Sequence, residues 1–320
     1  MYKRVLETIH THNLFHDGAT IIVGVSGGAD SMALLHILQR LSVKHNYTII
    51  IAHVHYGIRG DAARTDRDRV VATADAFGNT VFIKDLTKKS HPTDEAWMRA
   101  TRYTFFETLQ RKHGADYIAT GHTMNDRVET LLHHLIRGSG LAGLAGIHYK
   151  RGIIVRPLLD CTRTAVENYC TKHTISFGVD ATNADTTYLR NRIRHDLIPL
   201  LRKNYNPQII TTLARTAQSI ADDYALLTDW SAHHSIPHQR THTSITFDAT
   251  TFCALAPALQ RHTLRNFAKT LAQTTPSFGM IEHWRRLIAS TKNKTQKMET
   301  DTLIITKNGA TVSMTVRTPS

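Results

Sequence analysis

Residues 20–42 set three features in a fixed order: an apolar run, a turn with two glycines and an amphipathic segment. Residues 20–25 (TIIVGV) carry no charge and no polar side chain after Thr20, which is typical of a parallel strand buried on both faces. Residues 31–42 carry apolar side chains at helical spacing. The order predicts one unit of an α/β sheet, with the turn at the carboxyl end of its strand.

The turn itself reads Ser26-Gly27-Gly28-Ala29-Asp30-Ser31. Adjacent glycines let backbone N–H groups converge on an anion, and a helix N-terminus is where phosphates bind. The two hydroxyls add donors, and Asp30 can hold a Mg²⁺ ion. We interpret the turn as a phosphate-binding loop, although it lacks the lysine of the P-loop of kinases. An ordinary turn that caps the helix is the alternative.

Strand-like and helix-like segments continue to alternate as far as residue 173. We expect strands at 47–54, 80–84, 116–120 and 152–156, and helices at 65–77, 94–112, 125–136 and 162–173. Alternation at this pace predicts an α/β fold with a doubly wound parallel sheet.

The alternation of strand-like and helix-like segments ends near residue 207. A long helix is expected at 208–230, followed by a segment rich in His, Thr and Gln at 231–246. Helices at 257–271 and 280–290 and short strands at 302–306 and 311–317 come next. We therefore predict a catalytic domain at 1–207, a helical linker at 208–230 and a small α+β domain at 231–320.

Charge and cysteine content narrow the classes of function. Lys and Arg number 39 against 26 Asp and Glu, a net charge of +13 that favours a polyanion such as RNA as partner. A merely basic protein is the alternative. The three cysteines form no CxxC pair, which argues against structural zinc, an iron–sulfur cluster or a disulfide framework. The N-terminus does not resemble a signal peptide and no apolar run is long enough to span a bilayer, so we expect a cytoplasmic protein without a membrane partner.

Two carboxylates follow the strand at 116–120. Asp126 and Glu129 are three residues apart on a predicted helix, so they share a face that points toward the nucleotide crevice. They can hold Mg²⁺, orient an ammonium group or act as a general base, whereas a solvated helix face is the alternative. His122 at the mouth of the same strand can orient phosphate or substrate, or simply be hydrogen-bonded.

Arginine pairs recur at helical spacing. Arg99 and Arg102 can reach one site, where guanidinium groups would match a phosphoryl group. Arg190 and Arg194 form a stripe suited to an RNA backbone or target nucleotide. Solvated basic helices are the alternative for both pairs. The glycines that follow Arg137 indicate a loop that can approach a ligand, or a plain flexible connection.

These blocks resemble, in order, the motifs of the tRNA(Ile)-lysidine synthetase family, which belongs to the PP-loop superfamily of N-type ATP pyrophosphatases. The matching segments are SGGADS at 26–31, HVHYGIR at 53–59, RATRY at 99–103, GHTMNDRVET at 121–130, RGSG at 137–140 and DATN through YLRNRIR at 180–194. The resemblance covers residues 22–201 and is loose beyond them.

The resemblance implies an adenine nucleotide α hydrolase-like fold and a carbon–nitrogen ligase that modifies tRNA. It implies that ATP adenylates C2 of the wobble cytidine of tRNA(Ile) with a CAU anticodon, that L-lysine replaces AMP, and that Mg²⁺ assists. It also implies a short form without a second C-terminal domain, and the homodimer that family members often form.

The resemblance also assigns roles to residues. The catalytic residues would be Asp30, Arg102, Asp126 and Glu129, with Asp30 as the Mg²⁺ ligand. The ATP-binding residues would be Ser26, Gly27, Gly28, Ala29, Asp30, Ser31 and His53. The substrate-binding residues would be Arg99, His122, Arg137, Gly138, Arg190 and Arg194.

Departures from the family pattern limit these roles. Thr123, Asn125 and Arg127 replace His, Asp and Gln, which leaves the carboxylate chemistry to Asp126 and Glu129. Tyr56 stands where the family has His. The alternatives are a tRNA sulfurtransferase of the same superfamily, which the unpaired cysteines disfavour, a non-catalytic tRNA-binding module and a small-molecule amidating ligase.

Overall fold

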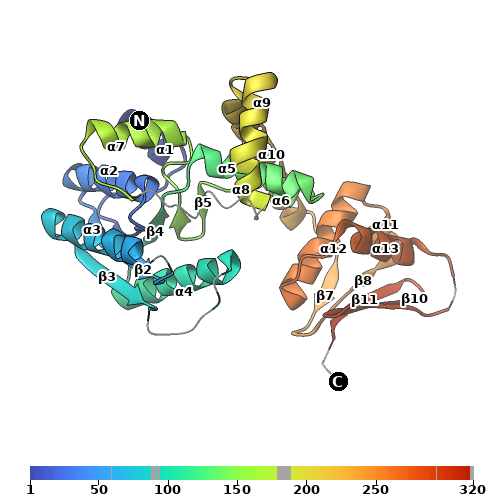
Figure 1. Ribbon diagram of the computed structural model, residues 1–320. Coiled ribbons are helices and arrows are strands. Elements are labelled where there is room, and N and C mark those ends of the chain that lie inside the picture. Colours follow the sequence, from blue (N-terminus) through green and yellow to red (C-terminus); the bar gives the residue numbers. More distant parts are fainter. Residues whose placement is uncertain (59, 88–91, 93, 179–188, 293, 318–320) are drawn as a thin grey trace. The chain divides into compact units, whose positions relative to one another are not determined.

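Figure 1 shows a computed structural model of the chain, which describes residues 1–58, 60–87, 92, 94–178, 189–292 and 294–317. The chain divides into two compact units, Met1–Ala221 and Asp222–Ser320. The division falls within the long helix α10 (Ile209–His233), in the stretch where the sequence predicts a linker. No helix among the described residues is long and apolar enough to cross a membrane.

The first unit alternates strands and helices in chain order. Its elements before α10 are α1 (Tyr2–Thr11), β1 (Thr20–Gly24), α2 (Ala29–His45), β2 (Thr48–His55), α3 (Asp61–Phe77), β3 (Thr80–Asp85), α4 (Glu95–His113), β4 (Tyr117–Thr120), α5 (Met124–Ile136), α6 (Leu141–Leu144), β5 (Lys150–Arg151), β6 (Ile154–Val155), α7 (Arg163–Lys172), α8 (Leu189–Arg192), a π-helical turn (Ile193–Leu197) and α9 (Ile198–Asn204).

The sheet of this unit has the order β3-β2-β1-β4-β6-β5, and all of its pairs are parallel except the short hairpin β5–β6. β1 lies between β2 and β4, with Ile22 opposite Ile50 on one side and Ile118 on the other. Sequence order runs outward in opposite directions from β1, so the carboxyl ends of β1 and β4 flank a topological switch point.

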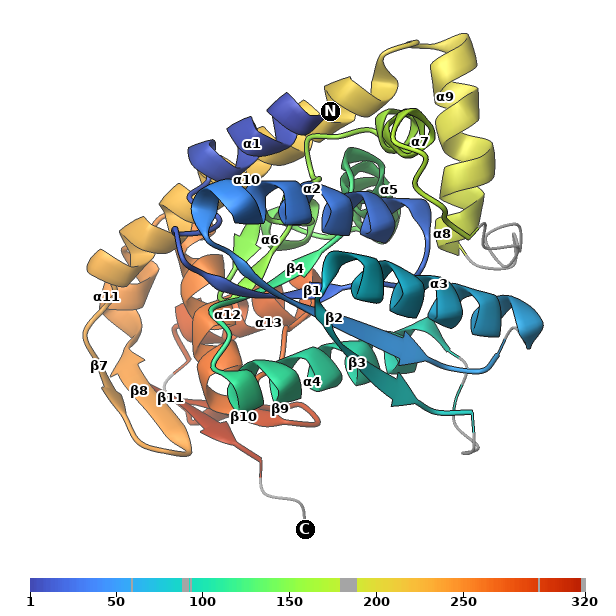
Figure 2. The same ribbon diagram turned by 90° about the vertical axis from the view of Figure 1, so that its left-hand side faces the viewer.

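Helices cover both faces of this sheet, as Figures 1 and 2 show. Ile21 and Val23 of β1 pack into a core shared with α1, α2, α3 and α7. Ile22, which alternates to the other face, packs against Phe106 and Leu109 of α4. The predicted doubly wound α/β fold is therefore confirmed. A strand covered on both faces has apolar side chains on both, which is why the run at β1 predicts it.

The second unit is a small α+β assembly, as predicted. A five-stranded antiparallel sheet of order β7-β8-β11-β10-β9 packs its apolar face against three helices around the buried Trp284. The elements are β7 (His238–Arg240), β8 (Ser244–Asp248), α11 (Ala249–Cys253), α12 (Pro257–Ala272), α13 (Phe278–Ala289), β9 (Gln296–Glu299), β10 (Leu303–Asn308) and β11 (Thr311–Val316).

Several elements differ from the sequence prediction. The strand expected at 152–156 is only Ile154–Val155, because Gly152 has a positive φ of 58° and turns the chain into the β5–β6 hairpin. The segment at 231–246 contains β7, whose three residues are all exposed and therefore show no apolar periodicity. The glycine-containing segment after Arg137 contains the short helix α6.

Candidate active site

A cavity of about 440 Å³ opens at the switch point, between the carboxyl ends of β1 and β4. Its volume lies in the range of small-molecule sites. Its lining includes Ser26, Gly28, Ala29, Asp30, Ser31, Ala52, Val54, Arg102, Tyr103, Phe106, His122, Asp126, Arg163 and Arg194. Apolar side chains of β2 and α4 form one part of the lining. The polar groups come from the segments after β1 and β4, from α4, and from the segments that carry Arg163 and Arg194.

The phosphate loop is held in shape by its own hydroxyl groups. Ser31 Oγ accepts a hydrogen bond from Ser26 N at 3.0 Å and donates to Gly28 O at 3.0 Å. The Gly28 N–H makes only a long contact of 3.4 Å with Ser26 Oγ, and no side chain caps the N-terminus of α2. Free N–H groups at a helix N-terminus form a site for an anion.

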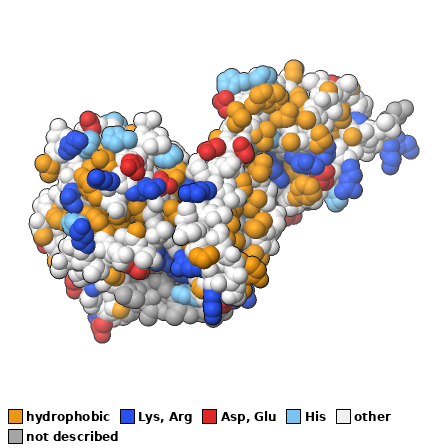
Figure 3. Space-filling view, turned by 90° about the horizontal axis from the view of Figure 1, so that it is seen from above, with side chains coloured by type: hydrophobic (Ala, Val, Ile, Leu, Met, Phe, Trp, Pro, Cys, Tyr) orange, Lys and Arg blue, Asp and Glu red, His pale blue; other side chains and the backbone are white. Residues whose placement is uncertain are grey.

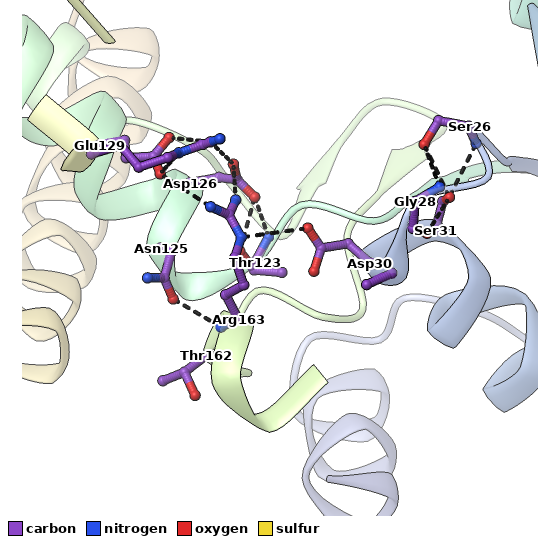
Figure 4. Close-up of polar contacts among 12 residues, drawn as sticks. Ser26, Gly28, Asp30, Ser31, Thr123, Asn125, Asp126, Glu129, Thr162 and Arg163 are labelled. Carbon is purple, nitrogen blue, oxygen red and sulfur yellow. Dashed lines mark hydrogen bonds and ion pairs between the residues drawn. The ribbon is translucent and has the colours of Figure 1, made fainter. Parts of the chain in front are cut away.

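Asp30 lies in the first turn of α2 and faces the cavity (Figure 4). Its Oδ1 is buried and has no hydrogen-bond partner among the described residues, and its Oδ2 is 4.0 Å from Arg163 Nε. Burial, and then the charge of Asp126, raises the pKa of Asp30 to about 7 although Arg163 and Arg194 oppose the shift. The two arginines therefore do not compensate for the burial of the Asp30 carboxylate and its repulsion by Asp126.

The donor set at Asp30 fits a hard divalent cation. An unpartnered carboxylate oxygen next to a phosphate loop is the ligand that Mg²⁺ takes from proteins, with phosphate oxygens and water completing its shell. No group of three or more His, Cys, Asp or Glu among the described residues is arranged to hold a metal ion.

Asp126 is fixed by the first turn of α5. Its Oδ2 accepts hydrogen bonds from Thr123 N at 2.8 Å and Thr123 Oγ1 at 2.9 Å, in a capping box. Its Oδ1 faces Arg190 Nη2 at 3.4 Å and Arg163 Nη2 at 3.8 Å. Burial works to raise the pKa of Asp126, yet the surrounding positive charges and the Thr123 N–H hold it below its usual value.

Glu129 lies behind Asp126 and does not line the cavity. Only 1% of its side chain is exposed, and both oxygens bind arginines: Oε1 is 2.7 Å from Arg194 Nε, and Oε2 is 3.2 Å from Arg190 Nε. The shared helix face predicted for Asp126 and Glu129 is present, but its two members differ. Asp126 borders the cavity, and Glu129 anchors the arginines.

Arg190 and Arg194, which both reach Glu129, lie on consecutive helical segments. Arg190 lies in α8 and Arg194 in the π-helical turn that precedes α9. Pro199, near the start of α9, has no N–H to donate to the carbonyl group of residue 195. The π-helical turn Ile193–Leu197 lies just before it. π-helical turns occur frequently at functional sites.

His122 follows β4 and lines the cavity. Its Nδ1 lies 2.9 Å from Thr120 Oγ1. Burial lowers the pKa of His122 to about 3, against the opposing charge of Asp126. The ring is neutral at physiological pH, so it can orient a ligand through a hydrogen bond without adding a charge.

Besides Glu129, the predicted site residues that do not line the cavity are Gly27, His53, Arg99, Arg137, Gly138 and Arg190. His53 is buried and lies with Nδ1 2.8 Å from Val25 O, so it contacts the strand that leads into the loop. Arg99 stacks on Tyr103, with 5.1 Å between its guanidinium carbon and the ring centre. Arg137 and Gly138 are exposed at the far end of α5 from Asp126. Arg102, in contrast, borders the cavity.

Arg163 is a charged site residue that the sequence analysis did not single out. It lies between Asp30 and Asp126 in Figure 4, 4.0 Å from one and 3.8 Å from the other. Its backbone N–H donates to Asn125 Oδ1 at 2.9 Å, which fixes the first turn of α7 to the start of α5. The sequence feature that could have indicated it is the position of this arginine directly after Thr162, the N-cap residue of α7.

The three residues that differ from the family pattern, at positions 123, 125 and 127, each make a specific contact. Thr123 caps α5, Asn125 binds the backbone of Arg163, and Arg127 is buried against the ring of Tyr149 with its Nε 3.3 Å from Ile147 O. The motif residues Arg59, 180–183 and Tyr188 lie outside the described residues.

Comparisons with known proteins are consistent with this geometry. A family model described as a PP-loop domain matches residues 2–201. A tRNA(Ile)-lysidine synthase from Clostridium tetani is 40% identical over 229 residues, which cover 70% of this chain and 49% of that protein. The enzyme of that name from Nostoc sp. is 32% identical over 308 residues, or 91% of this chain and 89% of that protein.

The chain thus spans about half the length of the Clostridium relative and most of the Nostoc relative. Among solved structures, the U34-tRNA thiolase NcsA from Methanococcus maripaludis matches with a TM-score of 0.57, covering 69% of this chain and 77% of that one. Its sequence is only 17% identical, so this match concerns the fold alone.

Proposed function

From the premise that this chain belongs to the PP-loop family, and within it to the tRNA(Ile)-lysidine synthases, we propose that it ligates L-lysine to C2 of the wobble cytidine of a CAU-anticodon tRNA(Ile). The cytosine O2 attacks the α-phosphorus of ATP, and pyrophosphate leaves. The lysine ε-amine then attacks C2, a C–N bond forms and AMP leaves. Adenylation is required because an unactivated carbonyl oxygen is a poor leaving group.

One observation carries the proposal: the phosphate loop and the carboxylate–arginine cluster border a single cavity. The N–H groups at the start of α2 suit the departing pyrophosphate, and Arg102, Arg163 and Arg194 suit the charge that develops on the α-phosphoryl group. The apolar side chains of β2 and α4 supply a wall for the adenine. We propose that Asp30 holds Mg²⁺, which neutralises phosphate charge when bound.

We propose that Asp126 receives the lysine ammonium group. Asp126 borders the cavity, whereas Glu129 does not line it and both oxygens of Glu129 bind Arg190 and Arg194. Both carboxylates remain candidates for assisting deprotonation of the amine, because Asp126 and Glu129 share one arginine cluster. His122, Arg99, Arg137 and Gly138 remain proposed substrate contacts.

The RNA partner is supported by charge. The chain carries a net +13, and Figure 3 shows Lys and Arg side chains distributed over the visible face of the described surface. A net positive charge suits a phosphate backbone, which contributes affinity through released counterions. We also propose a cytoplasmic location and a homodimer. The homodimer rests on the family resemblance alone.

Sulfur transfer is the less favoured alternative. Cys161 and Cys170 are buried, and burial raises the pKa of each thiol to about 11, so neither is a ready thiolate. Cys253 is exposed but lies in the second unit. The three thiols therefore lack the reactive pair that persulfide chemistry uses.

The test combines ATP–pyrophosphate exchange with uptake of labelled lysine into unmodified CAU-anticodon isoleucine tRNA. We expect exchange that requires this tRNA, and lysine uptake that an Asp126→Asn variant loses. Exchange that ignores tRNA, or label arriving from cysteine sulfur, would overturn the proposal. A tRNA in which the wobble base is uridine is the matched negative substrate.

A further inference from the structure

A short segment from outside the phosphate loop lies along it. Residues 176–178, here called the strap, end with a backbone N–H of Gly178 that donates to Gly27 O at 2.9 Å. Gly28 and Gly178 form an isolated parallel β-bridge. Phe177 and Gly178 also line the cavity, so the strap contacts both the loop and the proposed ligand space.

The strap fixes the orientation of one peptide group in the loop. In a trans peptide the C=O and the next N–H point in opposite directions. Because Gly27 O accepts from the strap on one side, the Gly28 N–H is directed to the other, toward Ser26 Oγ at 3.4 Å, and both Ser26 and Gly28 border the cavity. The positive φ of 91° at Gly27 is part of this arrangement.

Asp66 of α3 lies against both glycines and is only 6% exposed. A Cβ added to Gly27 would lie 2.9 Å from Asp66 Cβ. A Cβ added to Gly178 would overlap Asp66 Oδ1 and lie 3.0 Å from its Cγ. The close approach of loop, strap and carboxylate thus requires glycine at both positions.

Arg69 completes the contact. Its Nη1 is 2.6 Å from Asp66 Oδ1, and its Nε donates to Ser176 Oγ at 3.1 Å. The guanidinium group therefore binds the strap to α3 and balances a buried carboxylate that would otherwise repel phosphate.

We propose that Asp66, paired with Arg69, is a positioning residue for phosphate binding: it holds the strap on the loop and so keeps the Gly28 N–H directed into the cavity. The inference rests on the phosphate-binding role proposed for the loop, and it adds α3 and the strap to that site. Asp66 acts through the glycines and need not touch the ligand.

The test is a double-mutant cycle on nucleotide affinity. We expect Gly178→Ala and Asp66→Ala each to weaken binding of Mg·ATP and of pyrophosphate about tenfold or more, the loss of one directed hydrogen bond to a charged group. The double variant is expected to match Asp66→Ala alone, because removing the carboxylate leaves space for the new methyl group. Asp66→Asn keeps the shape and the acceptor for Arg69, so it is expected to retain wild-type affinity.

Two controls separate positioning from loss of fold. Gly279→Ala adds a methyl group in α13 with nothing within 4 Å, and we expect no change in ATP affinity. The KM for lysine is expected to stay constant in folded variants, as judged by their thermal unfolding. Additive losses in the double variant, or wild-type affinity in Gly178→Ala, would overturn the inference. Absence of ATP binding by the wild-type protein would instead refute the proposed function.

Discussion

Replacing Asp30 with Asn is expected to make the folded protein more stable while it removes activity. The carboxylate has a pKa raised from 3.8 to about 7, which means that the folded protein binds this proton more tightly than the unfolded chain does. The stability contributed by the site is then lost progressively as pH rises from 3.8 through about 7. Asparagine cannot ionise and avoids this cost.

The magnitude follows from the pKa difference. At about 1.4 kcal/mol per pH unit, the charged carboxylate costs about 4 kcal/mol at about pH 8 and about 2 kcal/mol at about pH 5.5. Asp30→Asn is therefore expected to raise the free energy of unfolding of the catalytic unit by these amounts relative to wild type. The variant would also lose the proposed Mg²⁺ ligand, and with it ATP–pyrophosphate exchange.

Urea unfolding of both proteins at the two pH values measures the difference, followed by a probe in the catalytic unit because two units need not unfold together. Asp75→Asn, at an exposed position of α3, is the matched control and is expected to change little. A variant that is no more stable than wild type at the higher pH, or a gain that does not shrink on acidification, would refute the reasoning.

Four further outcomes are expected. Thr123→Ala removes a capping hydrogen bond to Asp126 and is expected to cost about 1 kcal/mol in urea unfolding; an unchanged midpoint would contradict the role of the capping box. Glu129→Gln removes the buried charge that pairs with both Arg190 and Arg194 and is expected to destabilise the protein by about 3 kcal/mol or more, whereas Glu299→Gln, at an exposed pair, is expected to leave the stability nearly unchanged; similar effects for both would be inconsistent with the burial described. Calorimetry of Mg·ATP binding in buffers of different ionisation enthalpy is expected to show on the order of half a proton more released near pH 7 by wild type than by Asp30→Asn, and equal release would argue against Asp30 as the group that titrates. Replacing all three cysteines with Ala is expected to preserve lysine uptake, and its loss in a folded variant would revive sulfur chemistry.

The arrangement of the catalytic unit was predictable because its signals are local. Residues 20–42 specify a strand, a turn and a helix by periodicity alone, and the repeated alternation limits the sheet to a doubly wound form. The proximity of Asp30 and Asp126 follows as well, since parallel strands bring their carboxyl ends to one edge. A strand as short and exposed as β7 carries no such signal.

The division of roles inside the site was not predictable from spacing. A spacing of three places Asp126 and Glu129 on one face, but it does not predict that Asp126 borders the cavity whereas Glu129 is buried against Arg190 and Arg194. Thr123 and Asn125 appear as departures in the sequence, yet their hydrogen bonds join α5 to Asp126 and to α7. The contact of Asp66 with Gly27 and Gly178 joins segments far apart in the chain, which no local pattern reports.

The central place of β1 in its sheet has a consequence for how the protein opens. β1 is hydrogen-bonded on both sides, by β2 and β4, whereas β3 and the β5–β6 hairpin lie at the edges. Amide hydrogens of residues 21–24 are expected to exchange with solvent only through the largest openings, and those of the edge strands through local fraying. The phosphate loop thus follows the strand whose hydrogen bonds are expected to open at the highest free energy. Transient fraying of the edge strands therefore leaves the strand that holds the loop intact.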